Sequence, residues 1–123
     1  MSVQQKILEQ LKSQVIELLD DLSNICNNDQ DILMVQVIFS SIDPEKLMTG
    51  FIEWVYPWKN FILQKNEEFF EKNDHIFGPL PVDKVEKFKV KFKDGTFDND
   101  DKETIWEYFN IFIKLIEKYN KIK

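Results

Sequence analysis

The amino-acid sequence predicts an all-α fold, a single compact bundle of about six helices spanning residues 1–123. Apolar residues recur at spacings of three and four through most of the chain, which is the period of an amphipathic helix. Capping residues and prolines divide this pattern into segments of ordinary helix length. With 43% hydrophobic and 14% aromatic residues, a chain of 123 residues can also bury a core without disulfides or metals.

The N-terminal segment carries an apolar seam with alternating spacings of three and four residues, which predicts a long first helix that ends near Asn27. Because the seam is shorter than three heptads, we interpret it as one face of a helix in an intramolecular bundle. A homodimer formed through the same side chains is the alternative. The residues of the seam are Leu8, Leu11, Val15, Leu18, Leu22 and Ile25, and the homodimer would use the first five of them.

Two shorter helices are predicted next. The first covers residues 30–40. The second begins after Asp43, because an N-cap acceptor followed by Pro44 at the first helical position is a start signal. It ends near Tyr56, because Pro57 cannot continue a helix. The residues expected to point inward from the 30–40 helix are Ile32, Leu33, Val35 and Phe39.

The fourth helix is predicted over residues 58–72, where large apolar side chains cover a wide arc of the helix surface. Lys65 falls within this arc, and we expect it to reach solvent or to pair with a carboxylate, because an unpaired buried ammonium is costly. Residues 78–81, Gly-Pro-Leu-Pro, then predict a stiff corner. The apolar residues of the arc are Trp58, Phe61, Ile62, Leu63, Phe69 and Phe70.

A fifth helix is predicted to start from an N-cap at Asp83. From Phe88 to Lys93, apolar residues alternate with lysines, which also fits a β-strand. We favour the helix because no segment after Asp94 and Gly95 alternates to supply a partner strand, although the pattern itself fits both.

The last helix shows the strongest periodicity, with an apolar face opposite a polar one. Asp100 and Glu103 have the spacing of a capping box at its start. Its apolar side is wide, which predicts that this C-terminal helix is a central element of the bundle. The residues on that side are Ile105, Trp106, Tyr108, Phe109, Phe112, Ile113, Leu115, Ile116 and Tyr119.

Composition excludes several function classes. The net charge is −6 and all positive charge is lysine, so no arginine finger or guanidinium clamp exists. Three glycines are too few for a Gly-rich phosphate loop. Cys26 and His75, the only residues of their types, are too few to build a zinc site and lie on different predicted elements. We therefore expect no metal, no cofactor and no enzymatic activity.

The chain contains no apolar run of the roughly eighteen residues that a membrane span requires. The N-terminus has no apolar segment after a basic start, as a secretory signal would. A single cysteine cannot form an intramolecular disulfide. These features predict an intracellular protein that is neither secreted nor embedded in a membrane.

Residues 54–119 resemble a family of small uncharacterised α-helical proteins from nucleocytoplasmic large DNA viruses, the giant viruses. The resemblance divides the domain into N-terminal helices, residues 1–42, and a virus-like stretch, residues 43–123. It implies an infected cell as the setting, in the cytoplasm, viral factory or nucleus, and a host or viral protein as the partner. The matching segments are Pro57-Trp58-Lys59, Lys65-Asn66-Glu67, Phe69-Phe70, Ile76-Phe77-Gly78, Leu80-Pro81, Asp83-Lys84-Val85, Asp101 to Trp106, Tyr108-Phe109 and Glu117-Lys118-Tyr119.

The leading functional hypothesis is a non-enzymatic protein-interaction module, because the chain lacks catalytic groups and is richer in aromatic residues than one core requires. The candidate surface is the corner between the fourth and fifth helices. A structural interpretation remains open, with Trp58 in the core and Asn66 and Asp83 as local caps. The residues of this predicted corner site are Trp58, Asn66, Glu67, Asp74, His75, Asp83 and Lys84.

Two alternative functions use other surfaces. A DNA- or chromatin-associated factor would use the lysine-rich fifth helix, although the acidic net charge and the neighbouring carboxylates favour a solvated, balanced face. A self-assembling virion component would use the seam of the first helix. The lysines of the candidate nucleic-acid surface are Lys84, Lys87, Lys89, Lys91 and Lys93.

Overall fold

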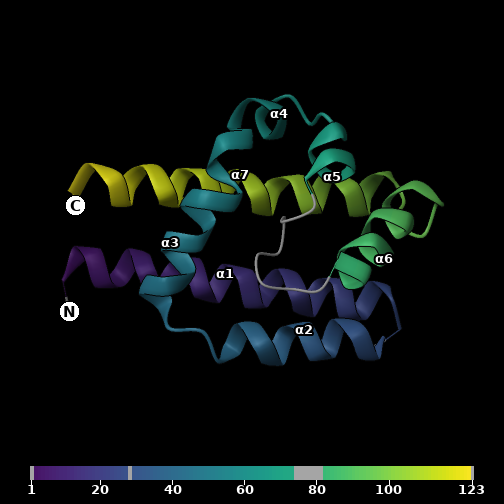
Figure 1. The fold of residues 1–123 in the computed structure, drawn as a ribbon, viewed down its shortest axis with the longest axis horizontal. Coiled ribbons are helices and arrows are strands. Elements are labelled where there is room, and N and C mark those ends of the chain that lie inside the picture. The colour runs from purple at the N-terminus through teal and green to yellow at the C-terminus, as the bar shows by residue number, and fades with distance from the viewer. Residues whose placement is uncertain (1, 28, 74–81, 123) are drawn as a thin grey trace.

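The computed structural model describes residues 2–27, 29–73 and 82–122, and within these ranges it contains helices and no strand (Figure 1). This confirms the predicted all-α fold. The segment from Phe88 to Lys93, whose sequence pattern fitted both a helix and a strand, is helical. The elements are α1 (Val3–Ile25), α2 (Gln30–Ser40), α3 (Pro44–Trp54), the 3₁₀ turn η1 (Tyr56–Trp58), α4 (Lys59–Leu63), α5 (Glu68–Lys72), α6 (Val82–Lys93) and α7 (Asn99–Ile122).

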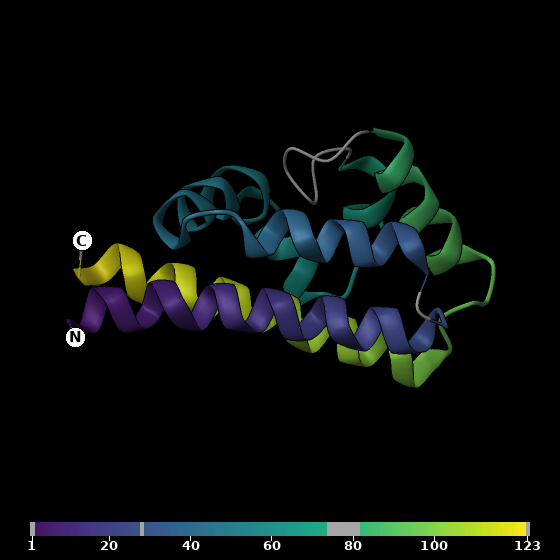
Figure 2. The ribbon, with the colours of Figure 1, turned by 90° about the horizontal axis from the view of Figure 1, so that it is seen from below.

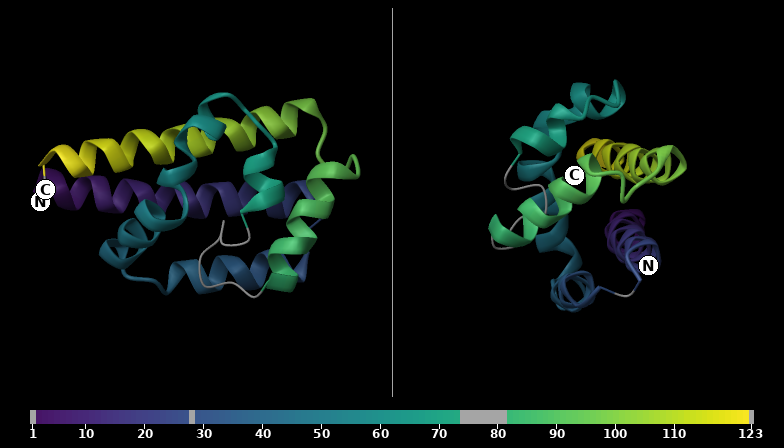
Figure 3. Two further views of the ribbon diagram at one scale, coloured as in Figure 1. Left: turned by 45° about the horizontal axis from the view of Figure 1, so that its top comes forward. Right: turned by 90° about the vertical axis from the view of Figure 1, so that its right-hand side faces the viewer.

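The helices form two layers. In the first, α1 lies between α7 and α2, and in the second, α3 to α6 cross one face of that layer (Figures 1 and 3). The long helices α1 and α7 run antiparallel, so both ends of the chain lie at the same end of the molecule (Figure 2). There, the side-chain amide of Gln4 donates a hydrogen bond to the Tyr119 hydroxyl at 3.4 Å. Because α7 packs against α1, α3 and α4, its predicted central place is confirmed.

The apolar seam of α1 is buried within the chain itself. The first five seam residues expose no more than 4% of their surface, Ile25 is half-buried at the end of α1, and α1 packs against α7, α2 and α3. The seam therefore packs inside the chain's own helical bundle, as the intramolecular interpretation predicted. A dimer through these side chains would require α1 to leave its own core.

Aromatic rings join the two layers. The Phe70 ring of α5 lies 4.3 Å from the Phe92 ring of α6 and 4.9 Å from the Trp106 ring of α7, measured between ring centroids. The Phe69 ring meets the Phe109 ring edge to face at 5.1 Å. Phe69 and Phe70 are almost completely buried, as the wide arc predicted. These contacts hold α5 and α6 against α7.

The predicted fourth helix is wrong in one respect, because the chain interrupts it at residues 64–67. Lys65 has a left-handed φ of 53°, and the Asn66 N–H reaches back to the Phe61 carbonyl at 2.8 Å. With a second bond from the Lys65 N–H to the Ile62 carbonyl at 3.1 Å, this is a Schellman motif that ends α4. The preceding helix also ends earlier than predicted, at Trp54, and Pro57 lies in η1.

Two side chains that we expected to be buried are exposed. Leu33 is 40% exposed because it lies on the side of α2 opposite Val35 and Phe39, which fill the core. Leu63 is 52% exposed because α4 ends there, so the continuous arc predicted for residues 58–72 does not form.

Helix starts were predicted correctly at α3 and incorrectly at α6 and α7. Asp43 accepts hydrogen bonds from the first turn of α3, as expected. Asp83 lies inside the first turn of α6 instead of capping it, because the helix already begins at Val82. The capping box of α7 is formed by Asp98 and Asp101, each accepting from the other's backbone N–H at 3.1 Å or less.

Glu103, the residue that we assigned to that box, instead pairs with Lys65 at 2.6 Å. Lys65 is exposed and paired with a carboxylate, as predicted. The stiff corner predicted at residues 78–81 lies outside the described residues.

Candidate partner-binding groove

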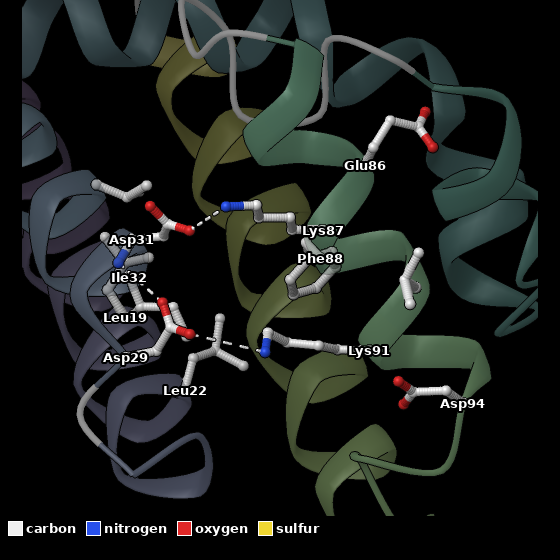
Figure 4. A pocket seen from close by; sticks show the side chains of 12 residues that line it. Leu19, Leu22, Asp29, Asp31, Ile32, Glu86, Lys87, Phe88, Lys91 and Asp94 are labelled. Atoms are coloured by element: carbon white, nitrogen blue, oxygen red, sulfur yellow. Dashed lines mark hydrogen bonds and ion pairs between the residues drawn. The ribbon is translucent and has the colours of Figure 1, made fainter.

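A cavity of about 460 Å³ opens between α2 and α6, above the C-terminal half of α1 (Figure 4). Its apolar residues come from three helices, and a volume of this size matches ordinary ligand-binding pockets. The stretch of α6 that lines it, residues 86–94, extends over roughly 12 Å, or about two helical turns. We call this feature the α2–α6 groove. Its apolar lining consists of Leu19, Leu22, Ile32, Val35, Phe88 and Val90.

Two ion pairs cross the groove from α6 to the N-terminal turn of α2 (Figure 4). The Lys87 ammonium lies 2.7 Å from an Asp31 carboxylate oxygen, and the Lys91 ammonium lies 3.8 Å from Asp29. Asp29 caps α2 by accepting the Asp31 N–H at 2.8 Å, which orients its carboxylate. The hydrogen bond to Asp31 raises the pKa of Lys87, so Lys87 stays charged at neutral pH.

Carboxylates outnumber lysines around the groove. Glu86 and Asp94 extend from the side of α6 away from α2 (Figure 4). Hydrogen bonds from Thr96, the shorter at 2.6 Å, lower the pKa of Asp94 and keep it ionised. The lining therefore holds four carboxylates and two lysines, and both lysines are already paired. A third carboxylate of the lining, Glu86, lies 3.5 Å from the buried Lys89.

Outside the groove, α2 presents three exposed apolar residues to solvent. Leu33 is 40% exposed, Met34 is 53% exposed and Val37 is 66% exposed. We call these three residues the α2 stripe. At 100° per residue, Met34 lies about 100° around α2 from the groove residue Val35, whereas Leu33 and Val37 lie about 160° from it, on the other side of the helix. Groove and stripe are therefore two separate apolar features of α2.

The predicted corner site is only partly described. Trp58 is half-buried against the rings of Phe61 and Phe69, at 5.2 and 6.1 Å. The Asn66 side chain accepts the backbone N–H of Glu68, the first residue of α5, at 3.0 Å, so it bonds to the local backbone ahead of that helix. Both residues thus have the structural roles that the sequence left open.

Glu67 is exposed and lies 3.6 Å from Lys102, and Asp83 is exposed on α6. Asp74, His75 and the side chain of Lys84 lie outside the described part of the chain. The described members of the predicted corner site therefore come from η1, the turn between α4 and α5, and α6.

The described members of the lysine surface all have a carboxylate within 4.0 Å. Lys87 and Lys91 pair with α2, as above. Lys93 lies 3.5 Å from Glu71. Lys89 is buried, lies 3.5 Å from Glu86 and donates to the Glu71 carbonyl at 3.2 Å. This face is locally balanced, which weakens the positive field that nucleic-acid binding needs.

Sequence reasoning missed the groove and the burial of Lys89. The burial had a signal, because Lys89 lies four residues after Val85 and three before Phe92, on the face that α6 buries. The groove had none, because Asp31 and Lys87 meet across 56 positions of sequence. Local patterns identify the helices but not the crossing of α2 and α6.

Within the described ranges, no three His, Cys, Asp or Glu side chains are grouped so that they could hold a metal ion. No helix found there combines the length and the apolar character needed to cross a bilayer. Cys26 is half-buried at the end of α1, and burial raises the pKa of its thiol. It is packed against the core as a small apolar residue.

Comparison of the chain with protein-family models, with curated proteins and with solved structures finds no match. The groove between α1, α2 and α6 and the exposed stripe of α2 are the features from which we infer a function.

Proposed function

We propose that this protein is a non-enzymatic helical interaction module that binds another protein through the α2–α6 groove and the α2 stripe. The observation that carries the proposal is that α2 has two apolar features, a groove on one side and the exposed stripe on the other. Single exposed apolar residues are ordinary on protein surfaces, whereas contiguous apolar surface with a polar edge is typical of binding sites. Here the edge is formed by carboxylates and ion-paired lysines.

A protein partner fits this surface better than a small molecule does. The groove is lined by residues of α1, α2 and α6, and α2 also exposes apolar side chains outside the groove, at residues 33–37. A small ligand held in the cavity would leave that stripe uncovered. A protein partner would cover both features.

The resemblance of residues 54–119 to proteins of large DNA viruses supports an infected cell as the setting. On this basis we propose a host or viral protein as the partner, encountered inside the infected cell. The chain ends lie at the opposite end of α1 from the groove, so a tag on either end leaves the surface accessible (Figure 1).

The test compares two double variants that remove exposed apolar side chains without changing the charge. Leu33→Gln with Val37→Gln alters the stripe, where exposure is 40% and 66%. Val3→Gln with Ile122→Gln is the matched control at the far end of the molecule, where exposure is 63% and 45%. Surface substitutions of this kind change stability by about 0.5 kcal/mol or less, so both variants should stay folded.

Each tagged variant is expressed during infection and crosslinked, and the co-purifying proteins are quantified by mass spectrometry for each cell compartment. We expect a partner that the wild-type chain and the control capture equally, and that the stripe variant captures at least about tenfold less, a loss of roughly 1.4 kcal/mol. Equal capture by both variants would contradict the proposed surface. If Glu67→Ala with Lys84→Ala abolished capture instead, the predicted corner would be the binding site.

A further inference from the structure

We propose that Met34 on the α2 stripe is an oxidation site, at which hydrogen peroxide converts the thioether to the sulfoxide and thereby switches the stripe from apolar to polar. This inference rests on the proposed protein-binding function and adds a means of regulating the same surface. Three observations support it: the exposure of Met34, the protection of the other sulfur atoms that the structure describes, and the position of Met34 among the apolar side chains of α2.

The two methionines that the structure describes differ in their access to solvent. Met34 on α2 is 53% exposed, whereas Met48 on α3 is 0% exposed and enclosed in the core. Met1 lies outside the described residues. Peroxide must contact a sulfur atom to oxidise it, so solvent access decides which methionine reacts. We therefore expect Met34 to react much faster than Met48.

The single cysteine competes poorly for peroxide. The reactive form of a cysteine is its thiolate. Cys26 is half-buried at the end of α1, and burial raises the pKa of its thiol, so little thiolate is present at neutral pH. The sulfur of Met34 needs no deprotonation, because a thioether is nucleophilic as it stands. Met34 should therefore take up the first oxygen.

The reaction transfers one oxygen atom to sulfur. The thioether sulfur attacks one peroxide oxygen, the O–O bond breaks and the S=O bond forms. The departing hydroxide takes the proton of the transferred hydroxyl group and leaves as water. Sulfur is oxidised by two electrons and peroxide is reduced by two. Methionine sulfoxide reductases reverse the change with a thiol reductant, so the modification can act as a switch.

The sulfoxide oxygen would lie among apolar side chains. Val37 and Ile38, three and four residues after Met34, are its neighbours on the surface of α2. Val37 is 66% exposed and Ile38 packs against the core. The helix contains no lysine, and its one charged residue, Asp31, pairs with Lys87. A partner surface that matches the apolar stripe would bury the new oxygen without a hydrogen-bond donor, which weakens binding.

The first experiment treats the full chain with dilute hydrogen peroxide and follows each sulfur atom by mass spectrometry of tryptic peptides. Met34 and Met48 fall in separate peptides, residues 13–46 and 47–59, and fragment ions separate an oxygen on Met34 from one on Cys26. We expect Met34 to be oxidised at least about tenfold faster than Met48. Repeating the treatment in unfolding urea should remove this difference, because the protection of Met48 comes from the fold.

The second experiment measures the apolar character of the surface without a partner, as retention on a phenyl hydrophobic-interaction column. The oxidised chain should elute earlier with an unchanged far-UV circular dichroism spectrum. Methionine sulfoxide reductases A and B, with dithiothreitol as reductant, should restore its retention. Met34→Leu should lose most of this response to peroxide, whereas Met48→Leu, the matched control, should keep it. Both variants replace methionine by an apolar side chain of similar volume, which protein cores tolerate.

Equal oxidation rates of Met34 and Met48, or a first oxygen on Cys26, would overturn the assignment of the site. Unchanged retention of the oxidised chain, loss of its helical spectrum, or an equal shift for Met34→Leu would overturn the switch.

The partner isolated from infected cells supplies the last test. The oxidised chain should capture this purified protein at least about fivefold less than the untreated chain does, the smallest effect expected for burying an unpaired polar group. If the stripe variant loses the partner but oxidation leaves capture unchanged, the switch is wrong and the proposed function stands. If Met34 is oxidised selectively but neither change affects capture, the proposed binding surface is wrong and only the oxidation site stands.

Discussion

Replacing Phe70 by alanine should cost about 3–5 kcal/mol of unfolding free energy, the usual range for deleting a buried phenylalanine ring. The Phe70 side chain is 1% exposed and lies within 5.7 Å of five aromatic rings, between centroids. Two of these rings belong to α6 and two to α7, so the cavity would open where α5 and α6 attach to the bundle. The surrounding rings come from separate helices and cannot collapse into it without backbone shifts. We therefore expect the loss of unfolding free energy for Phe70→Ala to lie in the upper part of this range.

The measurement is urea denaturation followed by far-UV circular dichroism and by tryptophan emission. The Trp106 ring lies 4.9 Å from Phe70, so its emission reports the region directly. At roughly 4 °C per kcal/mol for a domain of this size, the Tm should fall by about 12–20 °C. Phe61→Ala is the matched control, because the Phe61 ring is half-buried on the neighbouring short helix and should cost about 1–2 kcal/mol.

A loss below about 1 kcal/mol for Phe70→Ala would refute the reasoning, because it would mean that the ring fills no core. Equal losses for the two variants would also contradict it, since the difference in burial would then have no energetic consequence. If the two spectroscopic probes gave different midpoints, α5 and α6 would unfold separately from the α1–α7 pair.

Asp98→Ala should cost about 1 kcal/mol by removing the capping box of α7, whereas Asp100→Ala should cost less than half as much; thermal melts of both variants test the order. Gly95→Ala should destabilise by about 1–2 kcal/mol in the same assay, because Gly95 has a φ of 89° and a side chain strains that conformation. The hydrogen bond from Lys59 lowers the pKa of Glu117 below its ordinary 4.5. The Lys59–Glu117 pair therefore stabilises the fold fully above pH 4.5, and this contribution is lost as the pH falls through the lowered pKa. Glu117→Gln should therefore lower the Tm at neutral pH and have no effect in strong acid; a difference that persists in strong acid would contradict the ion-pair explanation.

Much of the fold could be predicted because helix signals are local. The Asp43–Pro44 pair fixes the start of α3 whatever surrounds it, and the apolar period of α7 gives its buried face directly. The break at Lys65 could not be predicted in this way. A Schellman motif is normally recognised by glycine at the left-handed position, and here a lysine adopts that conformation.

The candidate site was less predictable, because it depends on how distant helices cross. The sequence of residues 28–31 indicates a helix boundary. Nothing in that sequence indicates that Asp31 forms an ion pair with Lys87 of α6. Asn66 shows the reverse case. Its local capping role was foreseeable from residue type, and the structure shows that its side-chain oxygen is occupied in this way.

The antiparallel pairing of α1 and α7 joins the first part of the chain that a ribosome makes to the last. During synthesis, α1 can reach α2 early, but the rest of its apolar face must wait until α7 has emerged. Closing so long a loop also raises the contact order of an otherwise local helical fold, which slows folding. Linking the neighbouring ends of α1 and α7 and cutting the chain between α2 and α3 would make these two helices consecutive, so that the contact with the longest loop becomes a local helical hairpin.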